Sequence, residues 1–279
     1  MSEPSGQNAR VEEIWRTYLT TGENEKEARQ RHVFRRLPGS PRCKNCYAPF
    51  GGWGSSVVRT FYGKRPSNMN PTLCNICEVF AREHHGGAEI ELSLLFGDVR
   101  GSTTLAEKMS PTDFGRLVDR FYKVSSKVMV SSDALIDKII GDQVSGMYTP
   151  GIAGPHHARR AIAAAHQLLK DTGHYGNGEP WIPVGVGVHT GLSFVGSLGS
   201  SDGTTDITVL GDVPNTAARL SSAARAGEIL GSEQALRAAG LPFDTLEPRS
   251  MELKGKTESV TVYSLTRDFL TKVDQSLAR

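Results

Sequence analysis

The hydrophobic and polar positions of the chain form their most regular pattern after about residue 88. Residues 89–97, EIELSLLFG, first alternate apolar and polar side chains and then become mostly apolar, which predicts a buried strand. A helix is predicted to begin at Ser110-Pro111 and to run to about residue 132, because serine is favoured as an N-cap and proline in the first helical turn.

The segments that follow continue to alternate between strand and helix. Residues 134–141 and 144–149, on either side of Asp142-Gln143, predict a β-hairpin, and residues 155–173 predict an amphipathic helix that ends at Gly173. Further along, the pattern predicts strands at 183–191, 192–199 and 206–211, a helix at 212–227 and a closing hairpin at 250–265. The order strand–helix–strand–strand–helix–strand is that of the ferredoxin-like fold, so residues 88–268 are predicted to form an α+β domain of βαββαβ type.

Residues 1–87 have a weaker pattern. A helical pattern over 9–31 breaks near Thr21-Gly22, and a short helix is predicted at 75–85. Between them, residues 38–73 are rich in Gly, Pro, Ser and Asn and can bury little apolar surface, so a cross-link is needed to stabilise them. We therefore predict a small irregular N-terminal module that ends at residue 87.

All four cysteines lie in this module, as two Cys-x-x-Cys pairs. Two such pairs are typical of a tetrahedral four-thiolate metal site, although the 27 residues between them exceed the roughly 15–20 of common zinc arrangements. We expect a structural Zn²⁺ there, with iron or an iron–sulfur cluster as the alternative. The expected ligands are Cys43, Cys46, Cys74 and Cys77.

Composition and charge narrow the class of protein. Hydrophobic residues make up 38% of the chain and charged residues 22%, which excludes wholesale disorder. The net charge of +2 is uneven, because residues 1–87 hold 13 Lys and Arg against 8 Asp and Glu. No run of basic residues reaches five, so we expect no specific nucleic-acid partner.

No stretch approaches the roughly 20 apolar residues of a membrane span, and the N-terminus lacks the apolar core of a signal peptide, so we expect no membrane span and a cytoplasmic protein.

Two aspartates carry the candidate chemistry. Asp98 follows the first predicted strand, and Asp142 lies at the tip of the predicted hairpin; in a ferredoxin-like sheet these positions share one edge. Two neighbouring carboxylates repel each other unless a cation compensates, and oxygen ligands favour Mg²⁺ or Mn²⁺. The small segment 100–104, RGSTT, opens a helix whose backbone N–H groups suit phosphate, so metal and phosphate together indicate a nucleoside triphosphate. For either aspartate alone, a helix cap or a turn is an equally good interpretation.

Four segments resemble the successive motifs of the class III adenylate/guanylate cyclase catalytic domain, in the family's order and spacing. They are LSLLFGDVRGSTTLAE, IDKIIGDQV, VGVGVHTG and TVLGDVPNTAARL, within roughly residues 90–266. The resemblance implies conversion of ATP to 3′,5′-cyclic AMP and pyrophosphate by a two-metal mechanism, with two Mg²⁺ or Mn²⁺ in each active site. It also implies a head-to-tail homodimer in which each site takes its metal aspartates from one protomer and its remaining groups from the partner.

The resemblance implies a role for each matching residue. Asp98 and Asp142 would hold the metal ions, assisted by the Val99 carbonyl. Asn215 would orient the ribose, and Arg219, one helical turn later, would stabilise charge at the phosphate under attack. The residues expected to bind the substrate are Lys138 and Thr208 at the base, and Gly101, Ser102, Thr103 and Lys254 at the phosphates.

The pair at the base distinguishes the expected substrates. Lysine can donate to adenine N1 and a threonine hydroxyl can accept from the 6-amino group, so Lys138 with Thr208 favours ATP. Asp206 lies two residues before Thr208 on the same predicted strand and is an alternative partner. Two other functions remain open: a guanylate or other nucleotide cyclase, and a catalytically weak nucleotide-binding or scaffold protein.

Overall fold

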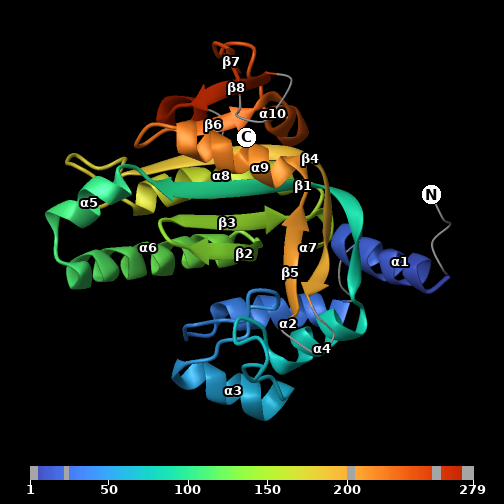
Figure 1. The fold of residues 1–279 in the computed structure, drawn as a ribbon. Helices are drawn as coiled ribbons and strands as arrows, with labels where there is room; N and C mark the ends of the chain where they lie inside the picture. The colour runs from blue at the N-terminus through green and yellow to red at the C-terminus, as the bar shows by residue number, and fades with distance from the viewer. Residues whose placement is uncertain (1–5, 22–24, 200–204, 253–258, 272–279) are drawn as a thin grey trace. The chain divides into compact units, whose positions relative to one another are not determined.

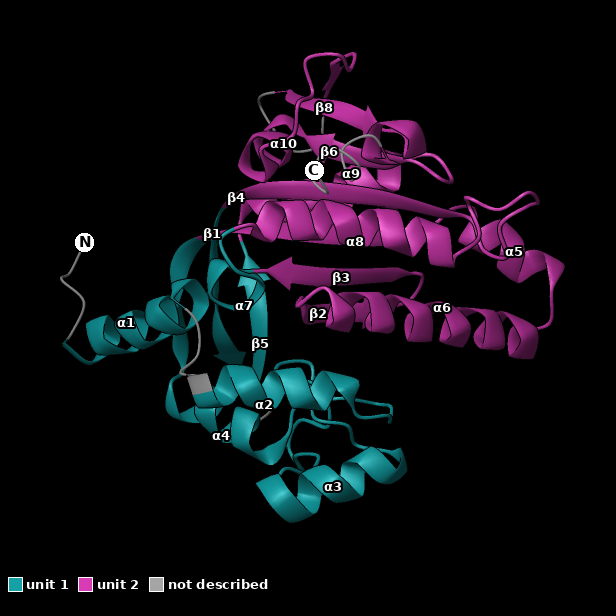
Figure 2. Ribbon diagram, turned by 180° about the vertical axis from the view of Figure 1, so that it is seen from behind, with its two compact units in different colours: residues 1–90, 149–155, 192–210 teal, residues 91–148, 156–191, 211–279 magenta. Residues whose placement is uncertain are grey.

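The computed structural model describes residues 6–21, 25–199, 205–252 and 259–271. These fall into two compact units (Figure 2), one formed by residues 1–90, 149–155 and 192–210 and the other by residues 91–148, 156–191 and 211–279. Among the described helices, none combines the length and the apolar character needed to cross a bilayer.

The core of the fold is a mixed sheet with the strand order β2-β3-β1-β4-β6-β8-β7 (Figure 1). Its first four strands occupy the ferredoxin-like arrangement, with β1 between β3 and β4, so the predicted α+β fold is confirmed. The strand bounds are β1 (Gly86–Val99), β2 (Leu135–Ile140), β3 (Gln143–Tyr148), β4 (Val184–Gly199), β6 (Ile229–Ser232), β7 (Arg249–Met251) and β8 (Val260–Leu265).

Helices connect these strands in the predicted order. Between β1 and β2 run α5 (Ser102–Lys108) and α6 (Pro111–Ser131), and between β3 and β4 runs α8 (His157–Asp171). The start of α6 is as predicted, because Ser110 is its N-cap and the Ser110 hydroxyl accepts from the Asp113 backbone N–H at 3.1 Å. The α6 and α8 helices contact each other and β3.

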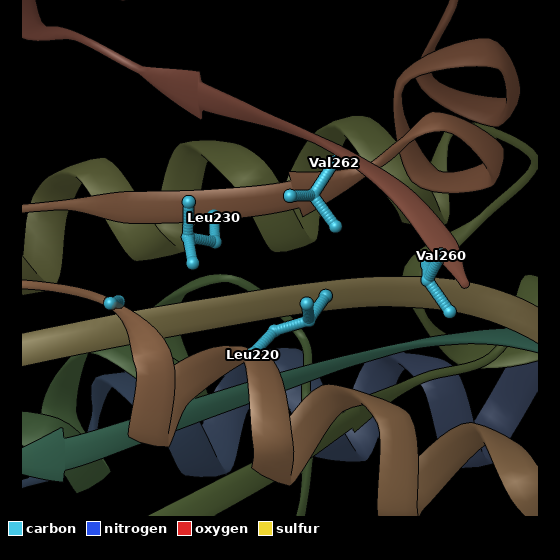
Figure 3. Packing of buried hydrophobic residues seen from close by; sticks show 5 residues of the cluster. Leu220, Leu230, Val260 and Val262 are labelled. Atoms are coloured by element: carbon cyan, nitrogen blue, oxygen red, sulfur yellow. The ribbon is translucent and has the colours of Figure 1, made fainter. Parts of the chain in front are cut away.

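The C-terminal part of the sheet differs from the sequence-based expectation. The two strands predicted at 183–191 and 192–199 are one continuous strand, β4, and the short elements β6 and α10 (Glu233–Ala239) were not expected. Leu230 of β6 packs with Val260 and Val262 of β8 and with Leu220 of α9 (Asp212–Ala223), as Figure 3 shows. A four-residue strand of sequence ILGS has no periodicity to reveal it, and this long-range packing stabilises it instead.

The unit that contains the N-terminus also includes two later segments. Its helices are α1 (Gly6–Thr20), α2 (Glu25–Arg36), α3 (Gly52–Tyr62), α4 (Asn75–Glu83) and α7 (Pro150–Ala153), and its own strand is β5 (Thr205–Leu210), which pairs with β4. The α1 helix contacts α7, and α4 contacts β5. Trp15 of α1 packs edge-on against Phe80 of α4 and donates its indole N–H to the His84 carbonyl at 2.7 Å. The α3 helix was not predicted, because its sequence, GWGSSVVRTFY, begins with two glycines and two serines that are poor helix formers.

The glycines of VGVGVHTG allow α9 to lie directly on β4. A Cβ atom added to Gly187 would lie 2.4 Å from the Ala217 carbonyl oxygen and 2.4 Å from the Ser221 backbone nitrogen, both in α9. Because backbone atoms cannot rotate away as a side chain can, any larger residue at Gly187 displaces the helix that carries Asn215 and Arg219.

The Gly187→Ala substitution is expected to lower the free energy of unfolding by about 1–3 kcal/mol through overpacking against α9. Gly115→Ala is the matched control, because Gly115 is an exposed position inside α6 where an added Cβ meets nothing within 4 Å. The control is expected to raise stability by up to about 1 kcal/mol, since alanine favours a helix over glycine. Urea unfolding followed by circular dichroism measures both, and equal effects of the two substitutions would contradict the close contact.

Candidate active site and four-cysteine centre

Asp98 and Asp142 lie beside each other at one end of β1 and β3. Asp98 is the penultimate residue of β1, and its register partner across the sheet is Gln143, the residue after Asp142. The Val99 backbone N–H donates to the Asp142 carbonyl oxygen at 3.0 Å. Adjacent strands lie about 4.8 Å apart, so the fold brings the two aspartates to one sheet edge, as expected from the topology.

The Asp98 carboxylate is nearly buried and has two polar partners. Only 9% of the residue is exposed, and its Oδ2 atom lies 2.5 Å from Arg100 Nη2 and 3.1 Å from the Ser222 hydroxyl, which donates to it. Asp98 is not a helix cap, because Gly101, with φ of +65°, precedes the first residue of α5. Arg100 neutralises the buried carboxylate in the absence of another cation, and Ser222 ties it to α9.

Asp142 lies in the two-residue turn between β2 and β3. The Ser102 hydroxyl donates to Asp142 Oδ2, and the Tyr122 hydroxyl donates to the Gly141 carbonyl at 2.6 Å. Burial and the Asp142 charge raise the pKa of Tyr122 above its ordinary value, so this hydroxyl stays protonated as a donor. A pocket of about 630 Å³ opens beside the turn, and its lining includes Ser102, Thr103, Phe114, Tyr122 and Asp142.

The donor set at this edge fits a hard divalent cation. Asp98 and Asp142 offer carboxylate oxygens, and Val99 offers a backbone carbonyl at the same strand end. Oxygen donors of this kind suit Mg²⁺ or Mn²⁺ rather than a softer metal. Asp98 and Asp142 would hold such a cation, and its charge would compensate Asp98 as Arg100 does in this structure.

A β-bulge sets the direction of Lys138. The pairing of β2 with β3 shifts register between Ile136 and Lys138, which leaves Asp137 as the extra residue. The Ser145 hydroxyl accepts from the Lys138 backbone N–H at 3.1 Å and donates to Asp137 Oδ2 at 3.0 Å. Asp137 is thereby kept inside the fold, whereas the Lys138 side chain is exposed.

Asn215 and Arg219 both lie on α9, one helical turn apart and therefore on one face. Asn215 is exposed, and its side-chain amide donates to the Gly211 carbonyl at 3.1 Å. Arg219 is partly exposed and, within the part of the chain that the structure describes, its guanidinium has no hydrogen-bond or ion-pair partner.

Thr208 lies on β5, in the unit that contains the N-terminus, opposite Gly196 of β4. Asp206 and Thr208 share one face of this strand, because side chains alternate along it. The Asp206 carboxylate forms an ion pair with Lys44 and accepts from the Asn70 side-chain amide at 3.3 Å. Lys254, the remaining residue expected to bind the substrate, lies outside the described residues.

The four cysteines form one buried cluster. Their sulfur atoms all lie within 4.8 Å of one another, none of the four forms a disulfide, and Cys46 Sγ lies 3.7 Å from Cys74 Sγ. Tetrahedral zinc with Zn–S bonds of about 2.3 Å places its sulfurs about 3.8 Å apart, so this spacing fits a four-thiolate metal centre.

The surroundings of the cluster favour thiolates. Backbone N–H groups point at sulfur, with 3.3 Å from Cys74 N to Cys43 Sγ and 3.5 Å from Cys77 N to Cys74 Sγ. Lys64 is buried with its ammonium 3.6 Å from Cys46 Sγ. Burial opposes the Lys64 charge, but the neighbouring thiolates raise its pKa above the ordinary value, so the lysine stays charged and offsets part of the cluster's negative charge.

Sequence reasoning missed the residues that hold the candidate groups in place. Arg100 and Ser222 both contact Asp98. Lys44 contacts Asp206, and Lys64 contacts Cys46. Ser145 contacts the Lys138 backbone. Arg100 lies two residues after Asp98, and Lys44 lies next to Cys43. This closeness in sequence to a candidate metal ligand is the local feature that could have indicated their roles.

Comparison with known proteins identifies the family. The sequence profile described as "Adenylate and Guanylate cyclase catalytic domain" matches residues 88–267. The chain is 28% identical over 183 residues to an adenylate cyclase of Anabaena cylindrica, which covers 62% of this chain and 36% of that protein. It is 30% identical over 186 residues to an adenylate cyclase of Mycobacterium bovis, covering 63% of this chain and 40% of that protein. The chain thus spans well under half the length of these relatives.

Solved structures agree with this match. The adenylyl cyclase CyaB from P. aeruginosa superposes with a TM-score of 0.56 at 27% identity, covering 64% of this chain and 94% of that one. The guanylyl cyclase Cya2 superposes with a TM-score of 0.57 at 25% identity, covering 64% and 93%. With the paired aspartates on the expected sheet edge and the family profile over residues 88–267, the chain belongs to the adenylate and guanylate cyclase catalytic domain family.

Proposed function

We propose that this chain is an adenylate cyclase that converts ATP to 3′,5′-cyclic AMP and pyrophosphate. The observation that carries the proposal is the pairing of Asp98 and Asp142 at one sheet edge within a domain of the cyclase family. Two Mg²⁺ or Mn²⁺ ions, when bound there, acidify the attacking ribose hydroxyl and neutralise the leaving pyrophosphate.

The chain's own residues position the substrate and stabilise charge. Arg219 supplies a fixed positive charge where negative charge develops on the phosphate under attack, and Asn215 orients the ribose. The exposure of both side chains on one face of α9 supports these roles. Gly101, Ser102, Thr103 and Lys254 remain proposed phosphate contacts.

The base contacts favour ATP over GTP. Lys138 donates to adenine N1, and the Thr208 hydroxyl accepts from the 6-amino group. Asp206, the alternative partner, forms an ion pair with Lys44 and accepts from the Asn70 side-chain amide. The adenylate cyclases among the relatives support the same substrate.

The active form is proposed to be a homodimer with two shared sites. Each unit of the single chain leaves large apolar side chains exposed: Ile140 is 67% exposed next to the Asp142 turn, and Leu192 is 64% exposed on β4. Apolar residues at such positions are suited to burial against a second copy. A monomer is expected to be almost inactive, because each site needs groups from both protomers.

We further propose that the four cysteines bind structural Zn²⁺ in a cytoplasmic protein. Unpaired buried thiols persist in a reducing compartment, where ATP is also available. Iron, alone or in a cluster, is the competing occupant for the same four ligands.

The first test is product formation with Mn²⁺ and, separately, ATP, GTP, CTP or UTP, resolved by mass spectrometry. Cyclic AMP from ATP is expected, and Asp142→Asn is expected to lower kcat by at least about 100-fold because the metal site loses a charged ligand. Asp244→Asn, at an exposed loop position, is the control and is expected to retain activity. Cyclic GMP as the main product would identify a guanylate cyclase, and an active Asp142→Asn variant would reject the metal site.

Mixing two inactive variants tests the shared site. Asp142→Asn and Arg219→Ala impair different halves, so a mixed dimer contains one intact site, and random exchange of equal amounts is expected to restore about a quarter of wild-type activity. Native mass spectrometry verifies the exchange. If mixed dimers form and remain inactive, the two halves do not come from different protomers.

Metal analysis tests the cysteine centre. The purified chain is expected to hold one metal equivalent, and Cys43→Ser is expected to lose most of it because one of four thiolate ligands is gone. Elemental mass spectrometry gives both the amount and the metal. Unchanged metal content in Cys43→Ser would remove this residue as a ligand, and iron in the wild-type protein would overturn the zinc assignment while keeping the site.

A further inference from the structure

The outer edge of β5 is covered by two side chains of the N-terminal module. On one side, β5 pairs with Phe194–Gly199 of β4. On the other, the Thr205 carbonyl accepts from the Asn70 amide at 2.9 Å, and the Ile207 carbonyl accepts from the Lys44 ammonium at 3.1 Å. Alternate carbonyls of a strand point to the same side, so these two contacts satisfy an edge that pairs with no strand among the described residues.

The same two side chains fix the face of β5 that carries Thr208. Lys44 forms an ion pair with Asp206, and Asn70 donates to the same carboxylate at 3.3 Å. These contacts fix the Asp206 side chain, which lies on the same face of β5 as Thr208, two residues further along the strand. Backbone and side-chain contacts together define both the position and the rotation of the strand.

Lys44 is in turn fixed by the cysteine centre. It lies between Cys43 and Cys46, and its backbone N–H donates to the Thr72 carbonyl at 3.0 Å. Only 8% of Lys44 is exposed. A lysine buried to this degree needs a partner for its charge, and Asp206 provides it.

Asn70 is fixed by the turn that leads into the second cysteine pair. Its side-chain oxygen accepts from the Thr72 backbone N–H at 3.0 Å and from the Thr72 hydroxyl at 2.6 Å. Its carbonyl accepts from the backbone N–H of Leu73, the residue before Cys74, at 3.0 Å. Both loops that present cysteines therefore extend a rigid polar side chain to β5.

We propose that Lys44 and Asn70 are positioning residues for recognition of the nucleotide base, through which the metal-bound cysteine module orients Thr208. The inference rests on the proposed function, because it assumes that Thr208 contacts the base. Lys44 has two effects: it places the strand, and it holds the Asp206 carboxylate away from the exocyclic group that Thr208 binds. Without Lys44, Asp206 loses its counter-charge and still accepts from the Asn70 amide, so the carboxylate is less firmly held beside Thr208 and the geometry of the base contact is lost.

The test is steady-state kinetics of the full-length Lys44→Met protein with ATP and GTP. KM for ATP is expected to rise at least about fivefold while kcat changes less than about twofold, because base binding is impaired and the phosphate chemistry is not. Lys26→Met is the matched control, an exposed lysine of α2 in the same module, and is expected to leave both constants unchanged. Metal content is measured on every preparation, since a variant that merely damages the module loses metal.

A double-mutant cycle identifies the contact itself. Lys44→Met combined with Asp206→Asn is expected to raise KM no further than Lys44→Met alone, because the two residues act through one ion pair. If Lys44→Met fails to fold, Asp206→Asn tests the same contact, because the Asp206 side chain is 46% exposed and tolerates a neutral isostere.

The outcomes separate this inference from the proposed function. A wild-type protein that forms no cyclic nucleotide rejects the adenylate cyclase assignment and this inference with it. An active wild-type protein whose KM for ATP is unchanged by both Lys44→Met and Asp206→Asn, at full metal content, rejects the inference alone. Equal losses of kcat and metal content in Lys44→Met would show a structural role only, and would also reject it.

Discussion

Convergence of four buried thiols on one point is the constraint on which the N-terminal module depends. Sulfur atoms within 4.8 Å of one another cannot all ionise without a compensating cation. Burial raises the pKa of the Cys43 thiol, whereas hydrogen bonds from Cys43, Cys46 and Cys77 lower the pKa of Cys74. A divalent metal ion held by all four sulfurs would neutralise part of this charge and would join the two loops that carry the cysteines.

The two loops that carry the cysteines also contact residues far outside their own segment. Residues 1–90 form a compact unit with residues 149–155 and 192–210, both of which lie inside the range matched by the cyclase profile. The module is therefore not an appendage joined by a linker. Its two cysteine loops satisfy the free edge of β5, which removes an exposed strand edge and gives that strand a defined position.

The sequence predicts features that are encoded locally. Ser110 and Pro111 specify the start of α6 through neighbouring backbone groups, and the apolar run before Asp98 specifies a buried strand. The ferredoxin-like order follows from those elements and predicts that Asp98 and Asp142 lie at one sheet edge, where the structure has them. The contact from Lys44 to β5 could not be predicted in this way, because it joins residues 163 positions apart and no local pattern marks either one. The α3 helix was missed for a related reason, since its glycines and serines oppose a helix that long-range packing stabilises.

Charge compensation explains why three of the missed residues, Lys44, Lys64 and Arg100, are basic. Asp98 and Asp206 are both carboxylates removed from bulk water to some degree, and each has a cation beside it, Arg100 or Lys44. The Arg100–Asp98 pair lies at the proposed metal site, whereas the Lys44–Asp206 pair does not. A metal ion held by Asp98 would add a second counter-charge beside Arg100, whereas the proposed reaction brings no further cation to Asp206. The ion pair between Lys44 and Asp206 therefore needs no rearrangement for the proposed metal to bind, whereas the pair between Arg100 and Asp98 would have to rearrange.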